Sequence, residues 1–542
     1  MLNQHLNLDH VSGMQGIQVP EDAETVTWSD GHITVLPTVM REGQNVLKED
    51  AELTKKLAEA PTSKPGSEFV AHFDFHHTSR DELILGIRAS LGEGKCVVVR
   101  GAEKPGPDVL SMEYLEKMYR IQSTMRVDMH DMELRAKESS KPHIAGTVGD
   151  LIAGIFNPNE QRCILDCVIS TGLPQYLSAL DDGLMAWHRT LQDCPLKGKF
   201  VHPDNFLVNG WGLIHQGGVV TAPHHDSEGQ NTFVIGDIGL KIWVWFFYKD
   251  SKDRRSLLQA SRSLCDKYDF SQFLAESVTV YPGDLIIQPP GQLHSVYTPI
   301  PSFTRGGHFY SYETLPSTEL SRWLDRCAGL LLTNQAHEHT EETLWRMTAV
   351  IPRLPPNEVP HRIPLLALCH MVLSAEKYVA QGTRSTILKK NAPKAIQSTS
   401  KDRAIAIVQK ILGHMDIAAR DLPGILEIAE DSDVIVDLGS CLSEFQNHHR
   451  NGSTDRLGLR SFDAAVFEQP PIRTTTEERQ HDLRHQQSRT FPDTRGAEQQ
   501  QQQSNGRPHP LQNQVYSDVN GLLIQLRPHR PRLIVKLLPH LH

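Results

Sequence analysis

The stretch LKIWVWFFY, residues 240–248, is apolar on both faces of the strand that it predicts. Successive side chains of a β-strand point to opposite sides of the sheet, and apolar residues here occupy both sides. Aromatic and β-branched residues also favour a strand over a helix. The one charged residue is Lys241, near the start. The stretch therefore predicts an interior strand, covered on both faces, with an ammonium group near one end.

Further strand signals surround this stretch between residues 206 and 313. Short apolar runs are separated by glycine and proline, and we expect no helix between them, which predicts an antiparallel barrel or sandwich. Pro282 and Gly283 suit the central positions of a type II turn, so residues 278–281 and 284–288 are expected to form a hairpin. The runs are GGVVTA (217–222), NTFVIGD (231–237), SVTVYPGDLIIQP (277–289), LHSVYTP (293–299) and GGHFYSYE (306–313).

The rest of the chain shows other secondary-structure patterns and a different composition. KCVVVRG (95–101) predicts a buried strand, residues 145–200 are expected to be mainly helical, and helical spacing returns after Leu315. From about residue 450 the composition is polar and includes five consecutive glutamines, so order is not expected there. We divide the chain into an N-terminal extension (1–67), a central domain (68–315) with its core at 206–313, a helical region (316–450) and a disordered, glutamine-rich tail (451–542).

Composition limits the classes of function. Of the 542 residues 39% are hydrophobic and 22% charged, which is ordinary for a globular protein, and the net charge of −10 gives no signal of nucleic-acid binding. The eight cysteines include no Cys-x-x-Cys pair, as expected in a reducing compartment. Neither a signal peptide nor an apolar run of eighteen residues is visible. We therefore expect an intracellular protein, nuclear or cytoplasmic, without a membrane span.

The sequence TAPHHD, residues 221–226, brings two histidines and an aspartate together. In a strand, His224 and Asp226 share one face and His225 points to the other. We expect the third ligand of a metal ion to be His294, which lies 294 − 224 = 70 residues further along. Two histidines and one carboxylate leave three positions of an octahedral ion open. This is the ligand set of non-haem Fe(II) oxygenases, whereas a closed four-ligand zinc site leaves no position open.

Two other interpretations of these residues stay open. The His-His-Asp cluster could belong to a surface loop, with Asp226 capping the turn that follows it. His308 is the main rival of His294 as third ligand. It could equally be a core histidine, or a hydrogen-bond donor that orients the metal site.

Lys241 adds to the interpretation of the metal site. Burying an unpaired ammonium is unfavourable by several kcal/mol, so the side chain either reaches solvent or meets an anion. One carboxylate of a small diacid would serve as that anion. The hydroxyl of Thr221 could then add a hydrogen bond to the same carboxylate.

Three motifs together resemble the JmjC (Jumonji-type) domain, a family of Fe(II)- and 2-oxoglutarate-dependent oxygenases. They are Thr-x-x-His-x-Asp (221–226), Gly-x-Lys-x-Trp (239–243) and Gly-Asp…His (283–294). The resemblance implies an α+β fold, a double-stranded β-helix (a cupin-like jelly-roll barrel) flanked by helices. It implies Fe(II) ligation by His224, Asp226 and His294, binding of 2-oxoglutarate by Thr221 and Lys241 with assistance from Asn231, and His308 where the family often has an asparagine.

The same resemblance implies a 2-oxoglutarate-dependent dioxygenase that consumes O2 and has no catalytic residues beyond the metal ligands. Its substrate would be a protein or peptide, histone included. The outcome would be demethylation of an N-methyl-lysine or hydroxylation of a side chain. The helical region 316–450 is expected to pack on the barrel or to form a homodimer contact. Two alternatives are a catalytically silent scaffold and a cupin-like isomerase or hydrolase that uses zinc or manganese.

Overall fold

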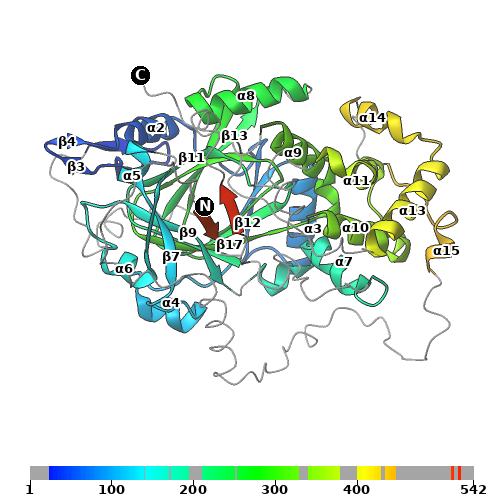
Figure 1. The fold of residues 1–542 in the computed structure, drawn as a ribbon, viewed down its shortest axis with the longest axis horizontal. Coiled ribbons are helices and arrows are strands. Elements are labelled where there is room, and N and C mark those ends of the chain that lie inside the picture. Colours follow the sequence, from blue (N-terminus) through cyan, green and yellow to red (C-terminus); the bar gives the residue numbers. More distant parts are fainter. Residues whose placement is uncertain are drawn as a thin grey trace, which may run out of the picture. The chain divides into compact units, whose positions relative to one another are not determined.

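The fold combines two main β-sheets with many helices (Figure 1). The computed structural model describes residues 24–138, 141–169, 172–194, 210–226, 228–250, 253–328, 332, 340–378, 399–428, 434–446, 514–517 and 523–526. Apart from the parallel pair β5–β6, the pairs within the two main sheets are antiparallel in this part of the chain. The expectation of an α+β protein is confirmed.

One sheet has nine strands and the other has four. In spatial order the larger consists of β5 (Val70–Asp74), β6 (Cys96–Arg100), β15 (Leu285–Gln288), β12 (Asn231–Ile238), β17 (Ser302–Phe309), β10 (Gly210–His215), β9 (Arg162–Ile169), β7 (Arg126–Asp131) and β8 (His143–Thr147). The smaller consists of β11 (Val219–His224), β16 (Leu293–Thr298), β13 (Lys241–Tyr248) and β14 (Phe273–Val280). Three short pairs are separate: β1 (Thr25–Thr27) with β2 (Ile33–Val35), β3 (Met40–Arg41) with β4 (Gln44–Asn45), and β18 (Gln514–Ser517) with β19 (Leu523–Leu526).

From β10 to β17 the chain passes back and forth between the two sheets. Strands β10, β12, β15 and β17 belong to the larger sheet, and β11, β13, β14 and β16 to the smaller. Side chains from both sheets meet in one apolar cluster, for example Val234 and Ile286 with Trp243 and Val296. Among the described strands neither sheet closes on itself, since β5 and β8 are the edges of the larger sheet and β11 and β14 those of the smaller.

The predicted interior strand is β13. Its residues 241–247 are all buried, and it lies between β14 and β16. Trp243 and Trp245 belong to the cluster between the sheets. Ile242 and Val244 lie on the opposite face, in a cluster that includes residues of the N-terminal segment. The alternating pattern thus predicted both the strand and its double coverage.

The expectation of no helix between the strands was wrong. Helix α8 (Arg254–Lys267) connects β13 to β14, and Asp253 caps its first turn by accepting the N–H groups of Arg255 and Ser256. Its apolar stripe is narrow, with Ala260 and Leu264 buried. Because most of the helix is charged or polar, its periodicity is weak in the sequence.

The predicted hairpin over residues 278–288 is wrong in its pairing, although its turn is present. Gly283 has a φ of +92°, and the amide of Asp284 donates to the carbonyl of Tyr281. The two strands nevertheless join different sheets, β14 beside β13 and β15 between β6 and β12. A turn fixes the local path of the chain, whereas strand pairing depends on neighbours distant in sequence.

Residues 145–200 are less helical than expected. The eight-residue strand β9 lies between β10 and β7. In its sequence RCILDCVI, apolar and charged residues do not alternate strictly, as they would in a half-buried strand. Pairing with β10 and β7 therefore decides its conformation.

Helices cover the outer faces of both sheets. Ser79 and Glu82 form a capping box at the start of α3, which packs on the larger sheet. Trp28 of the N-terminal segment stacks on Tyr297 of the smaller sheet, with ring centroids 5.8 Å apart. The segment beyond residue 23 is thus part of the packed core. The helices before β10 are α2 (Lys48–Ala58), α3 (Arg80–Gly92), α4 (Met112–Tyr119), α5 (Met132–Lys137), α6 (Val148–Ala153), η1 (Gln175–Leu180) and α7 (Asp182–Thr190).

The predicted helices after Leu315 are present (Figure 1). Among the described residues they contribute most of the largest apolar cluster. The cluster also takes in Tyr310, Tyr312 and Trp187, so the helical region packs on the β-domain. The helices are η2 (Tyr312–Thr314), α9 (Leu315–Ala328), α10 (Thr340–Val350), η4 (Ile351–Arg353), η5 (Pro356–Glu358), α11 (Arg362–Leu373), η6 (Ala375–Lys377), α13 (Thr399–His414), η7 (Ala419–Asp421), α14 (Leu422–Ile428) and α15 (Ser443–Gln446). Within the described ranges, no helix is both long and apolar enough to cross a membrane. Apart from β18 and β19, the predicted disordered tail lies outside the described residues.

Replacing Trp187 with alanine should lower the free energy of unfolding by about 3–5 kcal/mol, the range for large aromatic side chains in a core. The indole is 3% exposed, donates to Thr343 and lies 4.0 Å beneath the guanidinium of Arg346. Chemical denaturation measures the change. Leu191→Ala, at an exposed position one turn away, is the control, and an equal loss in both variants would contradict the prediction.

Candidate metal centre

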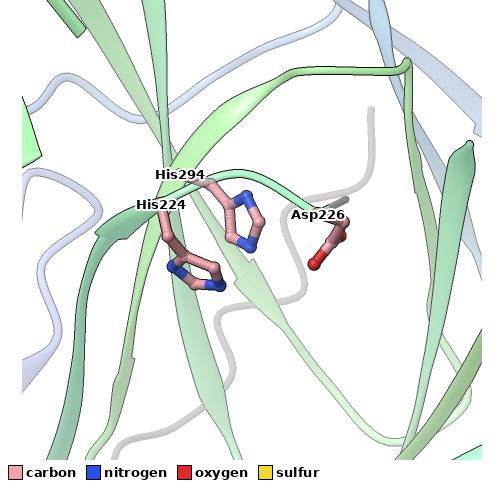
Figure 2. A group of neighbouring side chains, drawn as sticks. All are labelled: His224, Asp226 and His294. Atoms are coloured by element: carbon pink, nitrogen blue, oxygen red, sulfur yellow. The ribbon is translucent and has the colours of Figure 1, made fainter. Parts of the chain in front are cut away.

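The three predicted metal ligands lie together (Figure 2). His224 ends β11 and pairs across the sheet with His294 of β16, while Asp226 follows in the loop after β11. One potential ligand atom of each residue lies within 4.8 Å of those of the other two, and the imidazole centroids are 4.3 Å apart. The pairing of β11 with β16 is irregular between Thr221 and His224. The arrangement gives a His-Asp-His group that can hold a metal ion.

Hydrogen bonds orient both imidazoles for ligation. The Nδ1–H of His224 donates to the carbonyl of Ala222 (2.8 Å), and that of His294 to the carbonyl of Gln292 (3.0 Å). A carbonyl can only accept, so each Nε2 keeps its lone pair. Burial lowers the pKa of both rings, that of His294 to about 3. Neutral imidazoles are the form that binds metal.

The Asp226 carboxylate has one oxygen engaged and one available. Its Oδ2 accepts hydrogen bonds from the Thr232 hydroxyl (2.6 Å) and the Gln288 amide (2.7 Å). Burial raises the pKa of Asp226, but His294, His308 and the other nearby groups lower it by more, so the net pKa lies below its ordinary value. The group is therefore an anion with Oδ1 available to a cation.

Gln288 was missed by the sequence analysis. Its Oε1 accepts from the indoles of Trp243 (3.2 Å) and Trp245 (3.1 Å), which requires its amide nitrogen to face Asp226. Trp243 also stacks on His294, with ring centroids 5.3 Å apart. The sequence signal was the alternation in LIIQ, which places Gln288 and Ile286 on the same, inward face of β15. Gln288 thus connects the Asp226 carboxylate to Trp243 and Trp245 by hydrogen bonds, and so holds Asp226 in position.

His308 orients Asp226 through a chain of hydrogen bonds. The indole of Trp211 donates to Nε2 of His308 (3.1 Å), so the ring carries its proton on Nδ1 and donates to Thr232 (3.0 Å). Thr232 in turn donates to Asp226. Of the roles considered for His308, this geometry matches the orienting donor, and both ring nitrogens are already engaged.

Replacing Thr232 with valine should weaken binding of a divalent cation about tenfold, the lower end of the range for residues that orient metal ligands. The change keeps the side-chain shape but interrupts the chain from His308 to Asp226. Titration with Co(II) measures the affinity. Thr304→Val removes a buried hydroxyl that has no hydrogen-bond partner among the described residues, and it should leave the affinity unchanged. Equal affinities in both variants would contradict the role of the chain.

Lys241 is buried, with 1% of its surface exposed, so it does not reach solvent. Its ammonium donates to Thr298 Oγ1 (2.8 Å), and within the described ranges no carboxylate pairs with it. Burial lowers the pKa of Lys241 to about 7, and nearby Cys163 raises it by less. Thr298 is four residues beyond His294 on β16, about 13 Å along the strand. Thr298 and His294 share one face of β16, so the Lys241 ammonium lies on the same side of the smaller sheet as the metal ligands, further along the strand.

Thr221 and Asn231 take different places. Thr221 pairs across the sheet with Val296, midway between His294 and Thr298, and cross-strand partners share a face. Its side chain is not joined to Lys241 by a hydrogen bond in the described structure. Asn231 donates to the carbonyl of Phe309 and to Thr314, and it neighbours the inward-facing Thr232. Asn231 therefore points to the opposite face of β12, and the structure does not bring it to the ligands.

The end of the interior that holds Lys241 has further polar groups without partners. Nδ1 of His215 and the hydroxyl of Ser302 are buried and have no hydrogen-bond partner among the described residues. The two residues pair across β10 and β17. The positive charge of Lys241 helps to keep the pKa of His215 well below its usual range, after the larger effect of burial. The stretch Gly212-Leu213-Ile214-His215 does not alternate, so no pattern in the sequence marked His215.

The geometry thus combines a group of two imidazoles and a carboxylate with an ammonium that no carboxylate among the described residues pairs with, further along the same apolar interior. Compared with models of protein families and with curated proteins, the chain gives no match.

Proposed function

We propose that the protein is an Fe(II)- and 2-oxoglutarate-dependent oxygenase of the JmjC type. The observation that carries the proposal is the pairing of two features in one interior. One is the His224, Asp226 and His294 group, and the other is the buried ammonium of Lys241 without an anionic partner among the described residues. The ligand set suits a ferrous ion that keeps open positions, and the ammonium suits the far carboxylate of a five-carbon diacid.

The path of the chain supports a double-stranded β-helix as the fold of β10 to β17. Alternation between two sheets is what this jelly-roll arrangement requires, and the strand orders β15-β12-β17-β10 and β11-β16-β13-β14 are consistent with it. The inward faces of both sheets would then line the active site. The metal ligands lie toward one end of this interior and Lys241 toward the other.

The residues have separate roles in the proposed mechanism. His224, Asp226 and His294 would hold the iron, which supplies the redox chemistry that couples oxidation of 2-oxoglutarate to oxidation of a substrate C–H bond. Lys241, Thr298 and Thr221 would anchor the far carboxylate of 2-oxoglutarate. The buried Trp243 and Trp245 would make the surroundings of the iron apolar. The chain of His308, Thr232 and Asp226 fixes the acid ligand.

The proposed substrate is a side chain of a protein or peptide, histone included. Hydroxylation of an N-methyl carbon on lysine releases formaldehyde and leaves the demethylated amine. Hydroxylation of an ordinary side-chain carbon leaves a stable product that is heavier by one oxygen atom. Both outcomes use the same metal centre and co-substrate, so the identity of the substrate carbon decides between them.

Turnover of 2-oxoglutarate tests the proposal. The full chain, loaded anaerobically with Fe(II), should form succinate when 2-oxoglutarate and O2 are added, whereas the Zn(II)-loaded chain should not. A peptide library then distinguishes release of formaldehyde from a gain of sixteen daltons. An Fe(II)-loaded protein that neither binds 2-oxoglutarate in calorimetry nor forms succinate would overturn the proposal in favour of a scaffold or a different metalloenzyme.

A further inference from the structure

The loop that carries two of the metal ligands is held by the first long helix of the helical region. We define the ligand loop as residues 224–226 and 228–230. Helix α9 begins six residues after β17 ends, and several of its side chains bond to this loop. The strands position His294 by regular pairing, but Asp226 lies beyond the end of β11. Its position therefore depends on contacts outside the sheet.

Asp325 of α9 holds the ligand loop at two points. Its Oδ1 lies 3.0 Å from Nε2 of His225, and its Oδ2 accepts the backbone N–H of Glu228 at 3.0 Å. These two points lie on either side of Asp226 in the sequence. His225 is 1% exposed and Asp325 15%, so the pair is shielded from solvent. One carboxylate thus brackets the acid ligand without touching it.

Three other bonds hold the same loop. Thr318 of α9 donates to the carbonyl of Gly229 (2.7 Å), and the hydroxyl of Tyr310 donates to the carbonyl of Glu228 (3.0 Å). The backbone N–H of His225 donates to the carbonyl of Leu332 (2.8 Å). Each bond comes from the segment that follows β17, from Tyr310 to Leu332.

The backbone of the loop is shaped to fit this helix. Glu228 and Gly229 both have positive φ angles, +63° and +67°, and the first is unusual for a residue with a side chain. A Cβ on Gly229 would lie 2.5 Å from the carbonyl oxygen of Thr318. The backbones of α9 and of the ligand loop are therefore in direct contact. The contacts with α9 stabilise the left-handed conformation of Glu228.

We propose that Asp325 and His225 are positioning residues of the metal centre, and that α9 sets the distance of Asp226 from the two imidazoles. The sequence analysis placed His225 on the face away from the metal. Through its contact with Asp325, His225 joins the ligand loop to α9. The inference rests on the proposed function only in requiring that the His-Asp-His group bind a divalent cation. It makes the helical region part of the metal centre rather than a separable partner-binding module.

Reciprocal coupling follows from this arrangement. If α9 favours the geometry that binds metal, bound metal must favour the docked position of α9 by the same free energy. Metal should then protect the backbone amides of α9 and of residues 228–230 from hydrogen exchange. The amides of α13, which contacts other helices of the region, should be protected less.

The test is a Co(II) titration of the full chain, followed by the visible absorption of the bound ion. Asp325→Asn removes the negative charge that faces His225, and it should weaken Co(II) binding about tenfold or more and change the visible spectrum. The matched control is Glu319→Gln on the same helix, since Glu319 bonds to Arg254 and Tyr378 and not to the loop. This control should lose thermal stability but keep the affinity and the spectrum within about twofold of the wild type.

Further variants make the test decisive. His225→Gln should weaken Co(II) binding as Asp325→Asn does, and the double variant should be no weaker than either alone, because the pair acts as a unit. If Asp325→Asn fails to fold, Thr318→Val takes its place and should raise the Kd at least threefold. If these variants fold and keep the wild-type Kd for Co(II) and the wild-type visible spectrum, the positioning role is wrong, and the proposed function is unaffected. A wild-type chain that binds no Co(II) would overturn the inference and the proposed function together.

Discussion

Replacing His294 with alanine should abolish metal binding and the turnover of 2-oxoglutarate. The imidazole is one of three ligands, and it is 2% exposed and stacked on Trp243, so no other side chain can take its place without rearranging the interior. The Kd for Co(II) should rise by more than about 100-fold, beyond the range for residues that only orient ligands. Succinate formation should fall below detection, and calorimetry and a succinate assay measure the two losses.

The control for His294→Ala is His370→Ala. His370 is also a buried histidine, but it lies on α11 in the helical region. Its replacement should lower stability and leave the Kd for Co(II) and the yield of succinate per folded protein unchanged. A His294→Ala variant that keeps the wild-type Kd while it remains folded would contradict the assignment of the ligand.

Replacing Lys241 with methionine should raise the KM for 2-oxoglutarate about 30-fold or more, since removing one member of a buried charge pair typically costs 2–5 kcal/mol of binding. Methionine preserves the length of the side chain but cannot bind the far carboxylate. Co(II) affinity should stay at the wild-type value, because the ammonium bonds to Thr298, four residues beyond His294, and to none of the three ligands. The control is Lys249→Met, an exposed position just beyond β13. Equal KM values in both variants would contradict the anchoring role.

The same replacement should stabilise the metal-free protein at neutral pH. Burial lowers the pKa of Lys241 to about 7 in the folded chain, against 10.5 for an ordinary lysine. Between these values the unfolded chain binds a proton that the folded chain has released, so wild-type stability rises with pH, by up to about 1.4 kcal/mol per unit. Lys241→Met lacks this slope. Its advantage should be largest near pH 7 and should shrink toward pH 10, and urea denaturation at several pH values measures the difference. A pH-independent difference would contradict the buried, neutralised lysine.

Local sequence patterns predicted the secondary structure correctly where buried and exposed positions recur at the regular spacing of a strand or a helix. Strand β13 follows from alternation alone, and the helices after Leu315 follow from helical spacing. His224 and Asp226 by themselves are a weak local signal, and the metal group was predictable only because Lys241 and the Gly-Asp…His motif (283–294) point to the same kind of site. The same signals failed for β9, whose apolar and charged residues do not alternate strictly, and for α8, whose apolar residues are too few to mark one face.

The distant partners of the site were not predictable. Gln288 and Thr232 look like ordinary strand residues, and their bonds to Asp226 exist only because β12, β15 and the ligand loop meet in space. The same holds for Asp325, one of two acidic residues on an amphipathic helix. Hydrogen bonds between groups far apart in the chain leave no periodic mark, so spacing does not reveal them.

The sequence by itself determined the apolar strand that carries Lys241 and the helical C-terminal region. It also determined that His224 and Asp226, as neighbouring imidazole and carboxylate groups, are candidate metal ligands. Side-chain alternation and helical periodicity are local properties, set by backbone geometry within a few residues. Only the tertiary structure decided that β14 and β15 join different sheets, that His294 meets His224 across β11 and β16, and that Lys241 is sealed from water. These outcomes depend on which strands become neighbours, and strand neighbours are chosen by the packing of the whole core.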